Sequence, residues 1–152
     1  MLFRSLDPAN IGRTFVSDQT YVVGREKVRE FARAVGETSP LCHDVVAAQA
    51  AGYADVVASS TFPIAITLEI VGDFVTDPAV GLDWSRVVHG DQRFAYIRPI
   101  VAGDELSVTT VIEDIKAIAG NDMITVRSDL VDADGSVVAQ VWTSLVARGE
   151  AA

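Results

Sequence analysis

The chain has 152 residues, of which 49% are hydrophobic and 22% are charged, and its formal net charge is −9. A chain of this length and composition can bury a core of its own, which excludes a disordered or fibrous protein. The acidic balance argues against nucleic acid and against an anionic membrane surface as partners, because proteins bind both mainly through Lys and Arg.

One cysteine, Cys42, and two histidines are too few for an intrachain disulfide or a four-ligand zinc site, and we expect neither a metal nor a cofactor. The first residues lack the apolar run of a signal peptide, and the longest apolar stretch, 62–71, is too short to span a membrane. We therefore expect a cytoplasmic protein with no membrane partner. No repeat or linker interrupts the sequence, so residues 1–152 are expected to form a single domain.

The beginning of the chain predicts a strand followed by a helix. Residues 14–23 are rich in β-branched and aromatic residues, which favours a strand that ends at Gly24. In residues 25–35 the apolar side chains recur three and four positions apart, as on one face of a helix. Gly36 fits the position just past the end of that helix.

A polar loop and a second, short helix come next. Residues 37–44 are polar around Pro40, which predicts a loop. Asp44 can cap a short helix over residues 45–51.

A strongly apolar segment, residues 62–71, predicts a helix that is buried on nearly every side. The preceding residues, Ser59, Ser60 and Thr61, and the following Pro63 are typical of a helix N-terminus.

The second half of the chain predicts antiparallel strands joined by tight turns. The expected strands are residues 87–97, 105–118, 123–131 and 137–147. Helices that precede such a series indicate an α+β fold with the helices on one face of the sheet. A twisted antiparallel sheet can also wrap around one apolar helix and bury it.

Several segments carry a resemblance to a known family. Residues 31–44 read Phe-Ala-Arg-Ala-Val-Gly-Glu-Thr-Ser-Pro-Leu-Cys-His-Asp and are followed by Ala-Gly-Tyr at 51–53. Together they resemble the signature of the MaoC-like (R)-specific hydratases and dehydratases. Residues 89–94 and 98–106 resemble a strand and a turn of the same family. The layout resembles in particular the small actinobacterial single-hot-dog subunits of (3R)-hydroxyacyl-carrier-protein dehydratases.

The resemblance covers about residues 10–148 and implies an α+β single hot-dog fold, in which a curved antiparallel sheet wraps around a long central helix. It also implies that two such domains pair, with their sheets running together and the active sites at the interface. The expected partner is a second MaoC-like hot-dog subunit, in a homodimer or a heterodimer.

The family resemblance further implies a particular chemistry. In the family, an Asp and a His on the loop transfer protons, an Asn helps to position the loop, and a backbone N–H at the start of the central helix polarises the thioester carbonyl. This chain has Glu37, Ser39 and Cys42 at the Asp, Asn and His positions, and His43 stands one position further on. We therefore expect Glu37 and His43 as catalytic candidates and Ser39 as a substrate-binding candidate.

Further substrate-binding candidates lie outside the loop. They are Ser59, Ser60, Thr61 and Gln92. The first three precede the central helix, where backbone N–H groups can bind a thioester oxygen, although plain capping explains them too. Strict alternation along the strand places Gln92 on the inner-looking face and His89 on the other, toward a rim or a partner. Gly90 is a candidate for a bulge or for a site of close backbone approach.

Plain structural roles compete with the functional ones. His43 can be a solvent-facing loop residue, and Glu37 a solvated acid that follows a helix. Cys42 can be a small apolar filler where the family has His. Arg93 and Arg98 are expected on a solvated strand face rather than at the phosphates of coenzyme A.

Three functions are therefore open. The first is a hot-dog subunit of a (3R)-hydroxyacyl-thioester dehydratase or enoyl hydratase in fatty-acid metabolism. It would bind an acyl-CoA or acyl-ACP thioester, while a partner with an intact Asp and His supplies the chemistry. The second is a self-sufficient homodimeric (R)-specific enoyl hydratase that uses Glu37 and His43. The third is a non-catalytic module that binds acyl thioesters.

Overall fold

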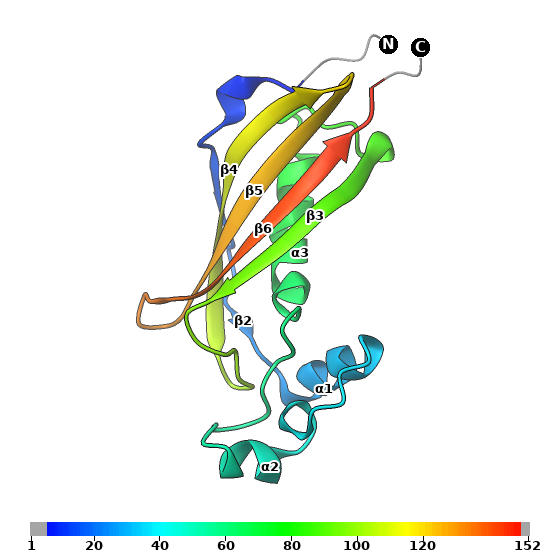
Figure 1. Ribbon diagram of the computed structural model, residues 1–152. Helices are drawn as coiled ribbons and strands as arrows, with labels where there is room; N and C mark the ends of the chain where they lie inside the picture. The colour runs from blue at the N-terminus through cyan, green and yellow to red at the C-terminus, as the bar shows by residue number, and fades with distance from the viewer. Residues whose placement is uncertain (1–5, 150–152) are drawn as a thin grey trace.

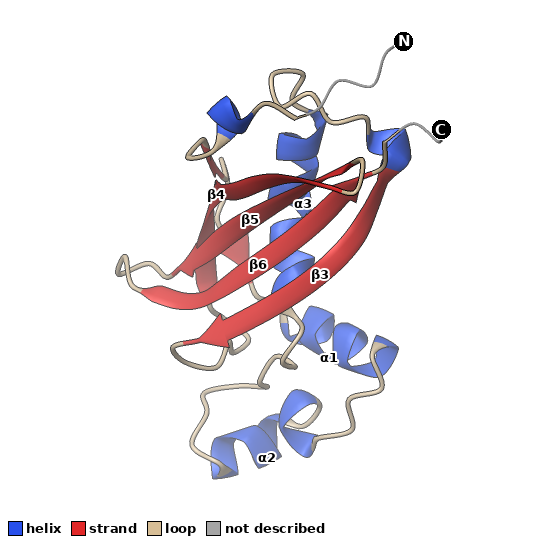
Figure 2. Cartoon of the chain, turned by 45° about the horizontal axis from the view of Figure 1, so that its top comes forward, coloured by secondary structure: helices blue, strands red, loops and turns tan. Residues whose placement is uncertain are grey.

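The computed structural model describes residues 6–149 and has two layers, a six-stranded antiparallel sheet and the helix α3 (Pro63–Thr76) that lies against it (Figure 1). Helices α1 (Arg25–Ala34) and α2 (Val45–Ala50) lie at one end of the molecule, beyond the start of α3 (Figure 2). A curved antiparallel sheet around one central helix is a single hot-dog fold, which confirms the predicted fold class.

The sheet has the strand order β1-β4-β5-β6-β3, and β2 pairs with β4 off this path. The strands are β1 Thr14–Val16, β2 Tyr21–Val22, β3 Val87–Tyr96, β4 Glu105–Ile118, β5 Asn121–Val131 and β6 Val137–Ala147. Short 3-10 helices cover Pro8–Asn10, Pro40–Cys42 and Trp84–Arg86. Tight turns join β4, β5 and β6 in sequence, whereas among the described residues β3 pairs only with β6 and forms an edge of the sheet (Figure 2).

The predicted strand over residues 14–23 is divided into β1 and β2. Ser17 N–H donates to Val108 O (2.9 Å), and Val108 N–H donates to Ser17 Oγ (3.0 Å). A side-chain oxygen thus takes the place of a main-chain acceptor, and residues 18–20 leave the ladder.

The residues predicted to end the helix before loop 37–44 and to cap the helix after it are confirmed. Gly36 follows α1 with a φ of +74°, a backbone conformation that residues other than glycine rarely adopt. Asp44 caps α2, because its Oδ1 accepts hydrogen bonds from Val46 N–H (2.8 Å) and Ala47 N–H (3.4 Å). These two residues set the two ends of the loop.

Helix α3 is longer than the predicted segment 62–71, since it continues to Thr76. It ends where Asp77 precedes Pro78, because the residue before a proline avoids the helical conformation. One flank is open to solvent: Leu68 is 63% exposed, so the prediction of a helix buried on nearly every side is wrong for the chain by itself. No helix in the described part of the chain has both the length and the apolar character that crossing a membrane requires.

The core lies between α3 and the inner face of the sheet. One apolar cluster contains Phe62, Ile66 and Leu130, and a second contains Phe74 and Ile124. Each of these side chains is at most 4% exposed. Burying a side chain of this size stabilises the fold by about 1.5–3 kcal/mol. The two clusters hold α3 against the sheet from its start to its end.

Candidate functional site

Loop 37–44 connects α1 to α2 and carries three of the candidate residues. Glu37 Oε1 accepts a hydrogen bond from Ser39 N–H (2.8 Å), and Ser39 Oγ accepts one from Leu41 N–H (3.3 Å). Both side chains therefore stabilise the turns of the loop backbone. Glu37 is half-buried, and one of its carboxylate oxygens already accepts this hydrogen bond.

His43 closes the same loop. Its ring nitrogen Nε2 lies 2.7 Å from Glu37 O, and because a carbonyl oxygen can only accept, this nitrogen carries a proton and donates. Arg29 on α1 donates from Nε to His43 O (2.8 Å) and so ties the end of the loop to that helix. The imidazole of the catalytic candidate is therefore engaged in holding the loop together.

Cys42 occupies the position at which the family has its His, and it is 5% exposed. Burial raises the pKa of its thiol, and the negative charge of Glu37 raises that pKa further. The thiol is therefore neutral at physiological pH and packs as a small apolar side chain.

Loop 37–44 is hydrogen-bonded to the segment that precedes the turn at residues 59–61. Val57 N–H donates to Leu41 O (2.8 Å), which joins loop 37–44 to the segment that leads into the turn. Both lie near the start of α3, at the end of the molecule that holds α1 and α2 (Figure 1). The structure thus brings most of the predicted candidates to one region.

The turn at residues 59–61 offers free hydrogen-bond donors. Tyr96 Oη donates to Ser60 O (2.6 Å), but in the described part of the chain no hydrogen bond uses the N–H groups of Ser60 and Thr61. The hydroxyl of Ser59 also lacks a partner there, although the residue is only 5% exposed. Such donors can bind an oxygen atom that carries negative charge.

The register of β3 shows that His89 lies on a different face of the strand from the one expected. The pairing with β6 shifts between His89 and Asp91, so Gly90 forms a bulge, as its candidacy indicated. His89 then lies opposite the buried Leu145 and faces the same side as Gln92. Strict alternation placed the two on opposite faces, and this is wrong because the bulge adds one residue to the strand.

Gln92 lies on the inner face of β3, and hydrogen bonds to three neighbouring residues hold its side chain. Its Nε2 donates to Trp142 O (2.9 Å) and to Thr143 Oγ1 (3.0 Å). His89 Nε2 lies 2.9 Å from Gln92 Oε1, which can only accept, so this imidazole nitrogen donates. The side chain is fixed in position, and its role in substrate binding stays a prediction.

Tyr96 is a site residue that the sequence does not reveal. Its hydrogen bond to Ser60 joins residues 36 positions apart, and no local pattern distinguishes Tyr96 from the other aromatic residue of its strand, Phe94. Only the packing of β3 beside the start of α3 makes the contact.

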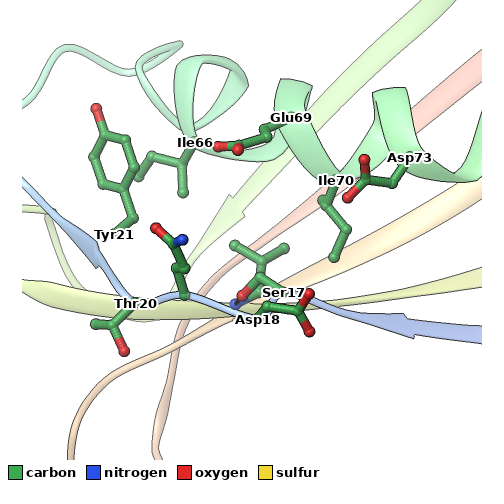
Figure 3. A pocket seen from close by; sticks show the side chains of 10 residues that line it. Ser17, Asp18, Thr20, Tyr21, Ile66, Glu69, Ile70 and Asp73 are labelled. Carbon is green, nitrogen blue, oxygen red and sulfur yellow. Dashed lines mark hydrogen bonds between the residues drawn. The ribbon is translucent and has the colours of Figure 1, made fainter.

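A pocket of about 210 Å³ lies between α3 and the segment that links β1 to β2 (Figure 3). Its lining includes the apolar Ile66, Ile70 and Val108 and the acidic Asp18, Glu69 and Asp73. None of the candidate residues belongs to it. Its carboxylates repel anionic groups such as phosphates, so it does not fit the phosphate-bearing end of an acyl carrier.

Comparisons with known proteins agree with this architecture. A family model described as "FAS1-like, dehydratase domain region" matches residues 9–141. A "UPF0336 protein" of Streptomyces griseus is 52% identical over 144 residues, which cover 95% of this chain and 96% of that protein. A "UPF0336 protein" of Streptomyces avermitilis is 54% identical over the same shares of the two chains.

Two solved structures are also similar. One, a "MaoC-like dehydratase", is 37% identical with a TM-score of 0.87, and the match covers 93% of this chain but only 43% of that longer chain. The other is the C-terminally truncated HadBC complex, a 3R-hydroxyacyl-ACP dehydratase of Mycobacterium tuberculosis. It is 32% identical with a TM-score of 0.83, and the match covers 90% of this chain and 96% of that one.

Fold and comparisons together define a hot-dog protein of the dehydratase type. The chain belongs to the MaoC-like dehydratase family, and the curated relatives that it matches over nearly their full length are the actinobacterial UPF0336 proteins.

Proposed function

We propose that this chain is the acyl-binding hot-dog subunit of a cytoplasmic (3R)-hydroxyacyl-thioester dehydratase, or enoyl hydratase, of fatty-acid metabolism. A second MaoC-like subunit with an intact Asp and His supplies the acid/base chemistry. The arrangement of two neighbouring residues in loop 37–44 carries the proposal. The imidazole of His43 is bound to the Glu37 carbonyl within the loop, and a buried, neutral Cys42 stands at the family's His position.

Dehydration requires a base that removes a proton from the carbon next to the thioester carbonyl, and an acid that protonates the departing hydroxyl group. The loop of this chain offers Glu37, whose carboxylate already accepts the Ser39 N–H, and His43, whose Nε2 proton faces a backbone carbonyl. Neither side chain is presented as a free proton carrier. This supports a partner subunit as the source of the acid and the base.

The binding half of the site is retained. The free N–H groups of Ser60 and Thr61 and the unpartnered hydroxyl of Ser59 support binding of the thioester oxygen at the start of α3. Gln92 would line the inner face of the edge strand beside the acyl group, and Ser39 would support the loop. The common part of acyl-CoA and acyl-ACP, the pantetheine thioester, is the expected ligand.

The edge of the sheet supports pairing with a second subunit. Strand β3 is ten residues long and its outer edge is unpaired in the described part of the chain. An unpaired edge of this length favours addition of another strand. The similarity to a subunit of the HadBC complex, at 32% identity, supports a second hot-dog subunit as the partner.

Co-expression with a MaoC-like subunit that has the full Asp and His motif tests the proposal. The chain alone, the partner alone and the two together are assayed for hydration of crotonyl-pantetheine. We expect the chain alone to be at least about a hundredfold slower than the pair, because its acid/base groups are displaced. Turnover by the chain alone at the rate of the pair would contradict the proposal.

The retained carboxylate of Glu37 keeps a self-sufficient homodimer as the second candidate function. His43→Ala separates the two candidates. Under the proposal, it lowers the free energy of unfolding by about 1 kcal/mol through the lost hydrogen bond and leaves turnover of the pair unchanged. Under the alternative, it abolishes turnover of the homodimer.

A chain that retains a bound acyl thioester but supports no turnover with any partner would instead be a non-catalytic binding module.

A further inference from the structure

Tyr96, the last residue of β3, connects the edge strand to the turn before α3. Its hydroxyl donates a hydrogen bond to Ser60 O at 2.6 Å. No other side chain within residues 6–149 donates a hydrogen bond to the turn at residues 59–61. Tyr96 is therefore the side-chain contact that ties this turn to the sheet, next to the main-chain hydrogen bond from Ala58 N–H to Ile100 O (2.8 Å).

The carbonyl of Ser60 and the N–H of Thr61 belong to the same peptide group. No peptide bond in the described part of the chain is cis, and in a planar trans peptide the C=O and the N–H point in opposite directions. Fixing Ser60 O against the hydroxyl of Tyr96 therefore also fixes the direction of the Thr61 N–H. That N–H donates to no acceptor within the described residues.

The same contact strengthens the donor. A hydrogen bond accepted by a peptide oxygen polarises the peptide, which makes its N–H a better donor to the next acceptor. Burial raises the pKa of the Tyr96 hydroxyl, so the group stays protonated and continues to donate throughout the physiological pH range.

We propose that Tyr96 is a positioning residue that directs the Thr61 N–H at the carbonyl oxygen of a bound acyl thioester. This inference rests on the proposed function, in which the turn at residues 59–61 receives that oxygen. Negative charge grows on the oxygen when the neighbouring carbon loses its proton. A donor already aimed at the oxygen therefore stabilises the transition state more than the bound substrate.

The experiment compares two tyrosines that each lose only a hydroxyl group. Tyr96→Phe removes the bond to Ser60 and keeps the ring, whereas Tyr21→Phe removes a hydroxyl for which residues 6–149 provide no hydrogen bond. Each variant is paired with the MaoC-like partner and assayed with crotonyl-pantetheine. We expect Tyr96→Phe to lower kcat about tenfold with KM within about twofold, and to lower Tm by only a few degrees, because one hydrogen bond is lost. Tyr21→Phe should leave all three unchanged.

A second readout does not depend on turnover. Butyryl-pantetheine labelled with ¹³C at the thioester carbonyl binds without reacting, because it has neither a double bond nor a hydroxyl group to exchange. In the unsubstituted pair we expect its infrared carbonyl band to move to lower frequency on binding, as hydrogen bonding to the oxygen requires. Tyr96→Phe should reduce this shift, and Tyr21→Phe should not.

The outcomes separate this inference from the proposed function. If the ligand binds and its carbonyl band and kcat are the same with and without the Tyr96 hydroxyl, the role of Tyr96 is overturned and the proposed function stands. A reduced kcat with an unaltered carbonyl band also overturns it, because the effect then arises elsewhere. If the pair neither binds butyryl-pantetheine nor hydrates crotonyl-pantetheine, the proposed function fails, and the inference fails with it.

Discussion

Cys42 is the residue at which this chain departs most from the chemistry of its family. It is 5% exposed, and burial together with the charge of Glu37 raises the pKa of its thiol. Because the thiolate is the reactive form, the folded protein should react with iodoacetamide at pH 8 at least about tenfold more slowly than the unfolded protein. Mass spectrometry of the alkylated chain measures both rates, with glutathione in the same denaturant as the control. Equal rates in the two states would contradict the structure.

Asp55 supports the fold through its charge. Arg25 donates to it from Nη2 (2.6 Å) and Val56 N–H donates to its Oδ1 (2.7 Å), and both bonds lower the pKa of this carboxyl. A lowered folded-state pKa stabilises the fold above the unfolded-state value of about 4, and this contribution is lost as the pH falls through the folded-state pKa. Asp55→Asn should therefore be less stable than the unsubstituted chain at pH 7.

The difference between the two proteins should shrink as the pH falls below about 4 and through the folded-state pKa of Asp55, because the protonated carboxyl is uncharged like the amide. Urea unfolding across this pH range measures the difference. Asp134→Asn, at an exposed position in the turn between β5 and β6, is the control and should show little pH-dependent difference. A loss of stability in Asp55→Asn that persists at low pH would assign the effect to the shape of the side chain instead of its charge.

At the scale of single elements, two buried threonines lie on the facing sides of α3 and the sheet, and we expect their replacement by valine to change the stability of the fold in opposite directions. Thr67 on α3 is fully buried and its hydroxyl has no hydrogen-bond partner among residues 6–149, whereas Thr110 on β4 pairs with Ser128 at 2.6 Å. Thr67→Val keeps the shape and removes an unsatisfied polar group, so it should stabilise the fold by about 1 kcal/mol. Thr110→Val leaves the Ser128 hydroxyl without its partner and should cost about 1–3 kcal/mol.

Urea unfolding of both variants checks this pair, because each substitution replaces a hydroxyl by a methyl group at a fully buried site. If Thr67→Val is destabilising, its hydroxyl makes a contact that the structure does not contain. If Thr110→Val is neutral, the bond to Ser128 contributes nothing net.

The elements also separate what the sequence can predict from what it cannot. The cap at Asp44 and the glycine at Gly36 act within a few residues, so their patterns predict the helix ends correctly. The division of the first strand depends on Ser17 meeting Val108, 91 positions away. The bulge at Gly90 depends on the register with β6. Contacts of this kind leave no periodic pattern. The sequence therefore predicts one unbroken first strand, and although Gly90 is a bulge candidate, strict alternation gives the wrong face for His89.

The candidate site also contains features that the sequence predicts and features that it does not. The family resemblance locates loop 37–44, and the helix N-terminus pattern locates the turn at 59–61. In the structure, the hydrogen bond from Val57 N–H to Leu41 O joins the loop to the segment that leads into the turn. The orientation of His43 depends on which backbone carbonyl its ring reaches, and the peptide group that contains the Thr61 N–H is hydrogen-bonded to Tyr96, which comes from another element. Spacing along the chain contains neither fact. Whether the site is used in this chain is therefore a question of three-dimensional contacts.

At the scale of the whole molecule, the flank of α3 marks where a second hot-dog subunit would lie. Ile66 lines the pocket beside the segment between β1 and β2, and Leu68 lies about 160° away around the helix, since each residue advances about 100°. Leu68 therefore faces away from that edge and toward the side of β3. At 63% exposure, it leaves most of a large apolar side chain in water on the flank away from the β1 edge, whereas the outer edge of β3 is unpaired in the described part of the chain.

Leu68→Glu should therefore weaken pairing without weakening the fold. Glu is a good helix former and is tolerated on an exposed position, but at an interface its charge loses water without gaining a partner. We expect the dissociation constant, measured by analytical ultracentrifugation, to rise at least about tenfold with an unchanged Tm. Val16→Glu is the matched control, because Val16 is also 63% exposed but lies on β1 at the opposite edge. If both substitutions leave association unchanged, the subunits do not meet at β3, and the site cannot receive its acid and base across that edge.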